Sequence, residues 1–215
     1  MAAVEPLPDL PEPSRIGERL REARQAGGLT VREVARRVGV SPSLISQIER
    51  NKVTPSVSTL WSLVTVLGLS MGDLFDDVEP PAAALGPRPV AAPTADSPTT
   101  APGSRAVINL ESGVTWERLT ADRDQVVEFL TITYAPGAES CDENSLLRHG
   151  GKEYGYVLRG VLGVRVGFDE YELHPGMAIS FDASSPHRLW AVGDRPAEAL
   201  WVVVGRQSNS RTPLI

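Results

Sequence analysis

Three side chains in the second half of the sequence, His149, Glu153 and His187, have the chemistry of metal ligands. Two imidazoles and one carboxylate can hold one face of a divalent ion and leave its other positions open. The three residues therefore form a candidate site for Fe(II), Zn(II) or Mn(II), or for a small polar effector. The alternative is that they bind no ligand and are satisfied by hydrogen bonds within the fold.

A second group of polar side chains lies in the first quarter of the sequence, around a helix that Ser41 can cap and that Pro42 can begin. Gln47 on this helix is the best candidate for reading a base, because a carboxamide can pair with adenine through two hydrogen bonds. The full set of candidate DNA-contacting residues is Thr30, Arg32, Ser41, Pro42, Ser43, Ser46, Gln47, Arg50, Asn51 and Lys52.

The charge is divided unevenly along the chain. The formal net charge is −6, yet residues 14–52 hold nine arginines or lysines against four glutamates, a local net charge of +5. Residues 1–13 carry −3 and residues 53–215 carry −8. A basic module joined to an acidic one indicates nucleic acid as the partner of the basic part, although a solvated helical surface can have the same composition.

Composition also divides the chain into modules. A length of 215 residues suits two small domains better than one large one. Residues 78–104 contain seven prolines and seven alanines and predict a semi-extended linker. Residues 1–13 contain four prolines and predict a disordered tail. The expected domains are then an N-terminal one at residues 14–77 and a C-terminal one at residues 105–215.

Before the linker, apolar residues recur at helical spacing and predict five short helices. Thr30 and Glu33 have the spacing of a capping box, and Gly27-Gly28 ends the first helix. The fourth helix is expected to place Trp61 in the helical core with its neighbours. The predicted helices are 16–25, one that opens at Thr30 and ends near Val38-Gly39, one with Ser41 as N-cap and Pro42 as its first residue, 58–67, and a short one after Ser70 through Leu74-Phe75.

After the linker, β-branched and aromatic runs alternate with turn residues and predict an all-β domain. Short strands at even spacing favour an antiparallel β-barrel or jelly roll. The predicted strands are 106–110, 115–119, 126–134, 153–159, 162–168, 171–173, 178–181, 187–192 and 199–205.

The stretch from Leu29 to Lys52 resembles the helix-turn-helix of phage-repressor-like, XRE-family DNA-binding domains, and the match extends over residues 16–75. In that family the second helix of the motif enters the major groove, which implies base contacts for Ser41 to Gln47. The resemblance also implies a structural pair between Arg24 and Glu49.

Residues 126–204 resemble the cupin family. The resemblance implies that His149, Glu153 and His187 are metal ligands, with Leu147 at the position of a fourth ligand, a histidine in the family. One wall of the site is then apolar, which favours an organic molecule over a structural ion, such as zinc, that is held only by protein ligands. His174, in a His-Pro-Gly turn, is expected at the surface.

Other features limit the class of protein. The longest apolar stretch is shorter than the roughly 20 residues of a membrane span, so a soluble protein is expected. The N-terminus lacks the pattern of a secretory signal. A single cysteine, Cys141, excludes an internal disulfide and fits the cytoplasm.

Together the two resemblances imply a ligand-responsive transcriptional regulator. It would bind double-stranded DNA at a pseudo-palindromic operator as a homodimer, with the apolar strand Trp201-Val202-Val203-Val204 as a candidate for association. The alternative is an enzyme, since iron-dependent cupin epoxidases also join a repressor-like helical domain to a cupin and hold iron with a His-x-x-x-Glu and a distant histidine. His149, Glu153 and His187 fit that arrangement as well.

Overall fold

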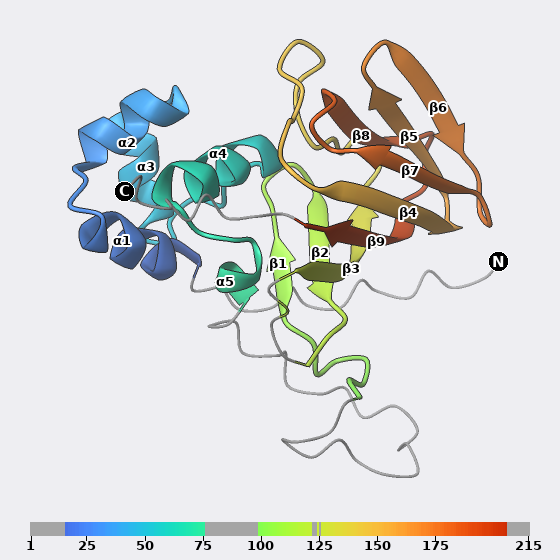
Figure 1. The fold of residues 1–215 in the computed structure, drawn as a ribbon, viewed down its shortest axis with the longest axis horizontal. Helices are drawn as coiled ribbons and strands as arrows, with labels where there is room; N and C mark the ends of the chain where they lie inside the picture. Colours follow the sequence, from blue (N-terminus) through green and yellow to red (C-terminus); the bar gives the residue numbers. More distant parts are fainter. Residues whose placement is uncertain (1–15, 76–98, 122–123, 125, 206–215) are drawn as a thin grey trace, which may run out of the picture.

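The computed structural model describes residues 16–75, 99–121, 124 and 126–205 (Figure 1). The expected tail and residues 78–98 of the expected linker lie outside these ranges. Within them, a helical domain precedes a β domain, as the sequence predicts. No helix of the described residues is both long enough and apolar enough to cross a bilayer.

The helical domain follows the capping residues closely. Thr30 accepts a hydrogen bond from the Glu33 amide while the Glu33 carboxylate accepts one from the Thr30 amide, which completes the predicted capping box. The Ser41 hydroxyl accepts from the Leu44 amide in the same way. The helices are α1 (Ile16–Ala26), α2 (Val31–Val38), α3 (Pro42–Ile48), α4 (Val57–Leu67) and α5 (Gly72–Phe75).

A largely buried ion pair fixes α1 against the end of α3. Arg24 Nε lies 2.6 Å from Glu49 Oε1, and Arg24 Nη2 lies 3.0 Å from Glu49 Oε2. The hydrogen bonds to Glu49 raise the pKa of Arg24 above its ordinary value. A third donor of the guanidinium, Nη1, reaches the Leu29 carbonyl at 2.9 Å. The predicted structural pair is confirmed.

Antiparallel strands make up the β domain in two sheets. One has the strand order β1-β2-β3-β9-β4-β7 and the other β6-β5-β8. The predicted all-β domain of antiparallel strands is therefore confirmed, with the strands in two sheets and not in a closed barrel. The strands are β1 (Val107–Asn109), β2 (Val114–Arg118), β3 (Val127–Tyr134), β4 (Lys152–Arg159), β5 (Val161–Val166), β6 (Asp169–Leu173), β7 (Ala178–Asp182), β8 (His187–Val192) and β9 (Ala197–Val204).

The apolar strand β9 has two different faces. Trp201 and Val203 are buried between the sheets, whereas Val202 and Val204 are only partly covered and lie on the outer face. The run that sequence reasoning offered for association is thus half interior, because side chains alternate across a strand. Only alternate residues of it are available to another chain.

The two domains meet along α4 and α5, which lie between helices α1 to α3 and the six-stranded sheet (Figure 1). Leu60, Leu63 and Val64 are buried in the helical core as expected. The placement of Trp61 in that core is wrong: its indole stacks on the imidazole of His149 in the β domain. Since Trp61 is adjacent to Leu60 in sequence, one helix position separates a core-facing side chain from one facing the other domain.

Candidate ligand site and DNA-binding surface

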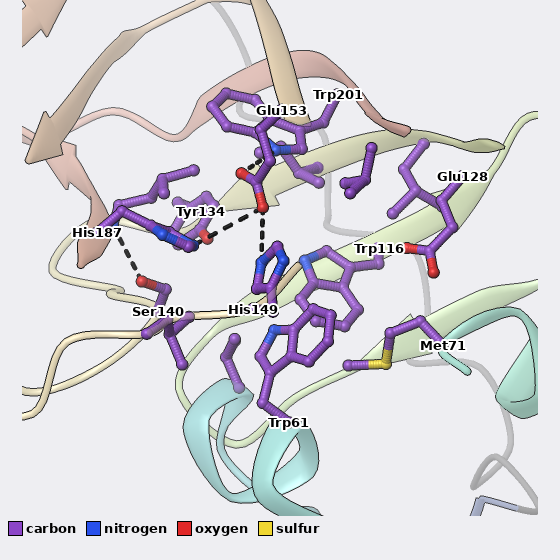
Figure 2. Close-up of a pocket in the computed structure, with 16 residues that line it drawn as sticks. Trp61, Met71, Trp116, Glu128, Tyr134, Ser140, His149, Glu153, His187 and Trp201 are labelled. Carbon is purple, nitrogen blue, oxygen red and sulfur yellow. Dashed lines mark hydrogen bonds and ion pairs between the residues drawn. The ribbon is translucent and has the colours of Figure 1, made fainter. Parts of the chain in front are cut away.

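The structure brings His149, Glu153 and His187 together between the sheets, as the sequence predicts (Figure 2). Glu153 lies near the start of β4 and points inward, with its backbone paired to Phe181 of β7. His187 begins β8. The chain before β4 is attached to β8 by reciprocal backbone hydrogen bonds of 2.9 and 3.0 Å between Leu147 and His187. This attachment carries His149 to the same cavity.

The distances among the three side chains are short. His149 Nε2 lies 2.8 Å from Glu153 Oε1, and His187 Nε2 lies 3.7 Å from the same oxygen. The two imidazole rings are 5.0 Å apart and perpendicular. One candidate ligand atom from each residue falls within 4.8 Å of the others. The Nε2 atoms and a carboxylate oxygen thus converge on one small volume.

The outer atoms of the three residues are held by the surrounding chain. His187 Nδ1 donates to the Ser185 carbonyl at 2.9 Å, and His149 Nδ1 donates to the Gly150 carbonyl at 3.0 Å. A carbonyl only accepts, so each ring carries its hydrogen on Nδ1 and directs Nε2 into the cavity. If Nε2 lacks a proton, its lone pair faces a carboxylate oxygen. A bound cation or a proton between these atoms removes that repulsion.

Trp201 supports the carboxylate from the opposite side. Its indole Nε1 donates to Glu153 Oε2 at 2.8 Å, which leaves Oε1 directed toward the histidines. The indole occupies space that only a glycine at position 155 leaves free: a Cβ at Gly155 would lie 2.1 Å from the ring of Trp201. Hydrogen-bonded supports of this kind orient metal ligands in proteins. The donor set and its supports therefore fit a divalent metal.

The cavity around these residues has a volume of about 40 Å³, enough for a few waters or an ion with part of its hydration shell. Its walls are mainly aromatic and aliphatic, with two carboxylates and, among the described residues, no arginine or lysine. Burial, together with the charge of Glu153, raises the pKa of the Tyr134 phenol, which stays neutral. The lining is Val57, Trp61, Met71, Trp116, Glu128, Leu130, Ile132, Tyr134, Ser140, Leu147, His149, Glu153, His187, Leu189, Trp201 and Val203.

Several of these residues were not predicted from the sequence. Trp61 reaches the cavity from α4, where it stacks on His149 with ring centroids 4.6 Å apart and planes 12° apart (Figure 2). Trp116 on β2 meets the Trp61 ring edge-on at 6.5 Å. The inward placement of Trp201 follows from the alternation along its strand. No local sequence pattern indicates the direction of Trp61, because the contact joins two domains.

Two further expectations concern residues near the site. Leu147 lines the cavity, as expected for an apolar wall, and His174 is exposed on the turn between β6 and β7. The single cysteine, Cys141, is buried, and burial raises the pKa of its thiol. Arg188 anchors that loop by donating to the Cys141 carbonyl at 2.9 Å.

The candidate DNA-binding residues lie on one surface around α3. Arg32, Pro42, Ser43, Arg50 and Lys52 are exposed, while Ser46 and Gln47 are half-buried. The opposite side of α3 buries Ile45 and Ile48 in the helical core.

Several of these residues also have structural partners. The hydroxyls of Thr30 and Ser41 cap helices, and Arg50 Nε donates to the Ser46 carbonyl at 2.9 Å. Asn51 adopts a positive φ of 53° and accepts a hydrogen bond from the Gly17 amide at 2.9 Å. Arg32, Gln47 and Lys52 are therefore better placed than Asn51 to contact DNA.

Comparison with known proteins matches each of the two domains separately and most of the chain at once. Residues 20–74 match a helix-turn-helix family model, and residues 130–203 match a cupin domain model. The chain is 30% identical over 173 residues to the HTH-type transcriptional regulator PuuR of Escherichia coli, covering 80% of this chain and 84% of that protein.

Two more proteins are similar along most of their length. The HTH-type transcriptional regulator SutR of Escherichia coli is 27% identical over 78% of this chain and 82% of its own length. A crystal structure of an HTH_3 family transcriptional regulator from Vibrio cholerae superimposes with a TM-score of 0.61 at 25% identity, covering 90% of this chain and 97% of that one. The order of the two domains is thus shared with proteins named as regulators.

Proposed function

Because the chain belongs to the family of HTH-type transcriptional regulators and joins its helix-turn-helix to a cupin domain, we propose that it regulates transcription in response to a ligand. In this proposal α3 reads double-stranded DNA and the cavity between the cupin sheets binds the ligand. The supporting observation is the two-sided character of α3, which buries Ile45 and Ile48 while Pro42 and Ser43 remain exposed.

Gln47 is assigned to base reading, and Arg32 and Lys52 to phosphates. Gln47 lies in the last turn of α3 and is half-buried, and adenine offers donor and acceptor atoms that match its carboxamide. Arg32 and Lys52 are exposed on either side of the motif, as phosphate contacts require. The net charge of +5 over residues 14–52 supports binding to a polyanion.

A homodimer is the proposed binding form, because one helix-turn-helix module buries little surface on DNA. The outer face of the six-stranded sheet supports an interface between two copies. Tyr154 and Tyr156 are 43% and 46% exposed there. Together with Phe129 and Val202 they line an open apolar groove. A second copy would cover this groove and place two α3 helices on successive turns of the duplex.

The proposed ligand site consists of His149, Glu153 and His187, which fit Fe(II), Zn(II) or Mn(II). A metal held by these three groups would supply open coordination positions for an effector. The chain's own part is to direct both Nε2 atoms and one carboxylate oxygen inward and to keep the site beneath aromatic side chains. The absence of arginine and lysine from the described lining favours cations over anions.

The same three residues would serve an iron-dependent oxygenase, so an enzyme is the competing proposal. Oxygen uptake by the iron-loaded protein distinguishes the two. The names of the relatives and the exposed polar side of α3 both support regulation.

Selection of duplexes from a random-sequence DNA library by the purified full-length protein tests the proposed function. The expected product is an inverted repeat with half-site centres about one helical turn apart. With Gln47→Ala, preference should relax at one base pair per half-site, at a cost of roughly 1 to 3 kcal/mol on the selected duplex. Recovery of unselected sequence by the wild type would overturn the proposal. Equal losses on all duplexes would remove Gln47 from base reading.

A further inference from the structure

The ligand cavity is not enclosed by the cupin domain alone. Val57 and Trp61 of α4, and Met71 just before α5, line it together with His149 and Trp116 of the β domain. Figure 2 shows Trp61 approaching His149 from the helical side, opposite the carboxylate of Glu153. One wall of the sensor cavity is therefore part of the DNA-binding domain.

We propose that Trp61 is a ligand-site residue contributed by the DNA-binding domain, and that its stack on His149 transmits occupancy of the site to α3. This inference rests on the proposed function and specifies its regulation. It assigns to Trp61 a role that the three candidate metal ligands do not have, since all three belong to the β domain.

The geometry of the stack makes it sensitive to the ligand. His149 contacts the cavity through Nε2 and contacts the indole of Trp61 through its ring face, 4.6 Å away. A cation on Nε2 withdraws electrons from the imidazole, and an electron-poor ring is held more strongly over the face of an indole. Ligand binding at Nε2 should therefore favour the stacked arrangement of the domains.

The size of the cavity also indicates that the position of Trp61 depends on the ligand. A volume of about 40 Å³ admits an ion and a few waters. A larger effector requires part of the cavity wall to move. Trp61 forms a part of that wall that belongs to the DNA-binding domain. A small and a large ligand would thus shift the domains in opposite directions.

Movement of Trp61 would reach the DNA-binding surface through a short rigid path. Leu60, its neighbour on α4, is fully buried in the helical core with Val34 of α2 and Ile45 of α3. A closely packed core moves as a body. Other contacts between the domains include a hydrogen bond of 3.2 Å from the Glu111 amide to the Pro55 carbonyl and the guanidinium of Arg118 over the Phe75 ring at 5.7 Å.

Coupling requires that the ligand bind two domain arrangements with different affinity, and it is then reciprocal. The experiment measures the dissociation constant of the full-length protein for the selected duplex, with and without Co(II). Co(II) is a divalent probe whose visible absorption reports its ligands. The wild type is expected to show a change of about 5-fold or more, within the usual range of coupling between sites.

Trp61→Ala is expected to bind one Co(II) and to reduce the change to less than about 2-fold, because the stack is lost while the three ligands remain. Trp61→Phe retains an aromatic ring and should restore part of the change. Tyr171→Ala, which removes an exposed aromatic side chain of β6, is the control and should respond like the wild type. Circular dichroism confirms that each variant is folded.

A full change in Trp61→Ala, or no change in the wild type with Co(II) bound, would overturn the inference and leave DNA binding itself intact. Loss of Co(II) binding in a folded Trp61→Ala protein would support the shared site, since no ligand atom has been removed. Failure of the wild type to bind any selected duplex is a different result and contradicts the proposed function.

Discussion

The DNA-binding surface and the ligand site are built in opposite ways. The candidate DNA contacts fall within residues 30–52, on two helices and the loops beside them, and the charged ones are exposed. The ligand site takes Glu153 from β4, His187 from β8 and Trp61 from α4, and two of these three are buried. A surface of the first kind can change without altering the fold, whereas a site of the second kind depends on packing over long sequence distances.

The largest expected effect tests whether the Arg24–Glu49 ion pair stabilises the helical domain that carries the DNA-binding surface. Arg24→Ala leaves the Glu49 carboxylate, which is only 7% exposed, without its partner. We expect a loss of about 3 to 5 kcal/mol in the free energy of unfolding of the helical domain. Chemical denaturation followed by circular dichroism measures it.

The control is Arg159→Ala, which breaks an ion pair with Glu198 in which the arginine side chain is 79% exposed. Its loss should be below about 1 kcal/mol. Equal losses from the two substitutions would mean that the Arg24 pair does not hold the domain together.

The second prediction concerns the dependence of the ligand site on packing. Gly155→Ala places a Cβ against Trp201 and displaces the indole that holds Glu153. We expect about 1 to 3 kcal/mol of destabilisation and a roughly 10- to 100-fold weaker divalent metal affinity. Calorimetric titration of the purified protein with Zn(II) gives the affinity.

Gly163→Ala is a matched control, because its Cβ would lie 2.1 Å from the ring of Trp190, which is not among the residues lining the ligand cavity. It should destabilise the β domain without weakening metal binding. If both glycine substitutions weaken the metal equally, support of Glu153 by Trp201 is not the cause.

The smallest expected effect concerns two exposed basic residues of the DNA-binding surface. Lys52→Ala and Arg32→Ala should each weaken binding about equally on selected and random DNA and reduce the slope of log affinity against log salt by about one unit. Neither should change the unfolding free energy by more than about 0.5 kcal/mol, since both side chains are exposed. A slope that stays at the wild-type value would remove that residue from the phosphate contacts.

This contrast also explains what the sequence could predict. Helix boundaries followed from local chemistry, such as the Thr30–Glu33 capping box and Pro42 after Ser41, and the structure reproduces them within about two residues. The triad was found because two histidines and a glutamate near predicted strand starts also match positions of the cupin motifs. The roles of Trp61 and Trp116 depend on how two domains meet, and hydrophobic periodicity gives no information on that contact.

For a related reason, the sequence could not distinguish a closed antiparallel barrel from two separate sheets. Nine strands at even spacing suit either a closed barrel or two sheets, and strand pairing decides between them. Here β8 pairs with β5 but is not hydrogen-bonded to β9, so the sheets stay separate. The pairing of β4 with both β7 and β9 joins strands that are distant in sequence, and no local pattern encodes it.

The central claim, that one chain reads DNA with α3 and senses a ligand with His149, Glu153 and His187, is tested most directly by His187→Ala. Binding to the selected duplex is titrated with and without Co(II) at one salt concentration, for the wild type, His187→Ala and the exposed-histidine control His174→Ala. We predict that His187→Ala binds the duplex within about 2-fold of the metal-free wild type and no longer responds to Co(II), while His174→Ala keeps the response of about 5-fold or more. A folded His187→Ala protein that responds to Co(II) as the wild type does would contradict the account.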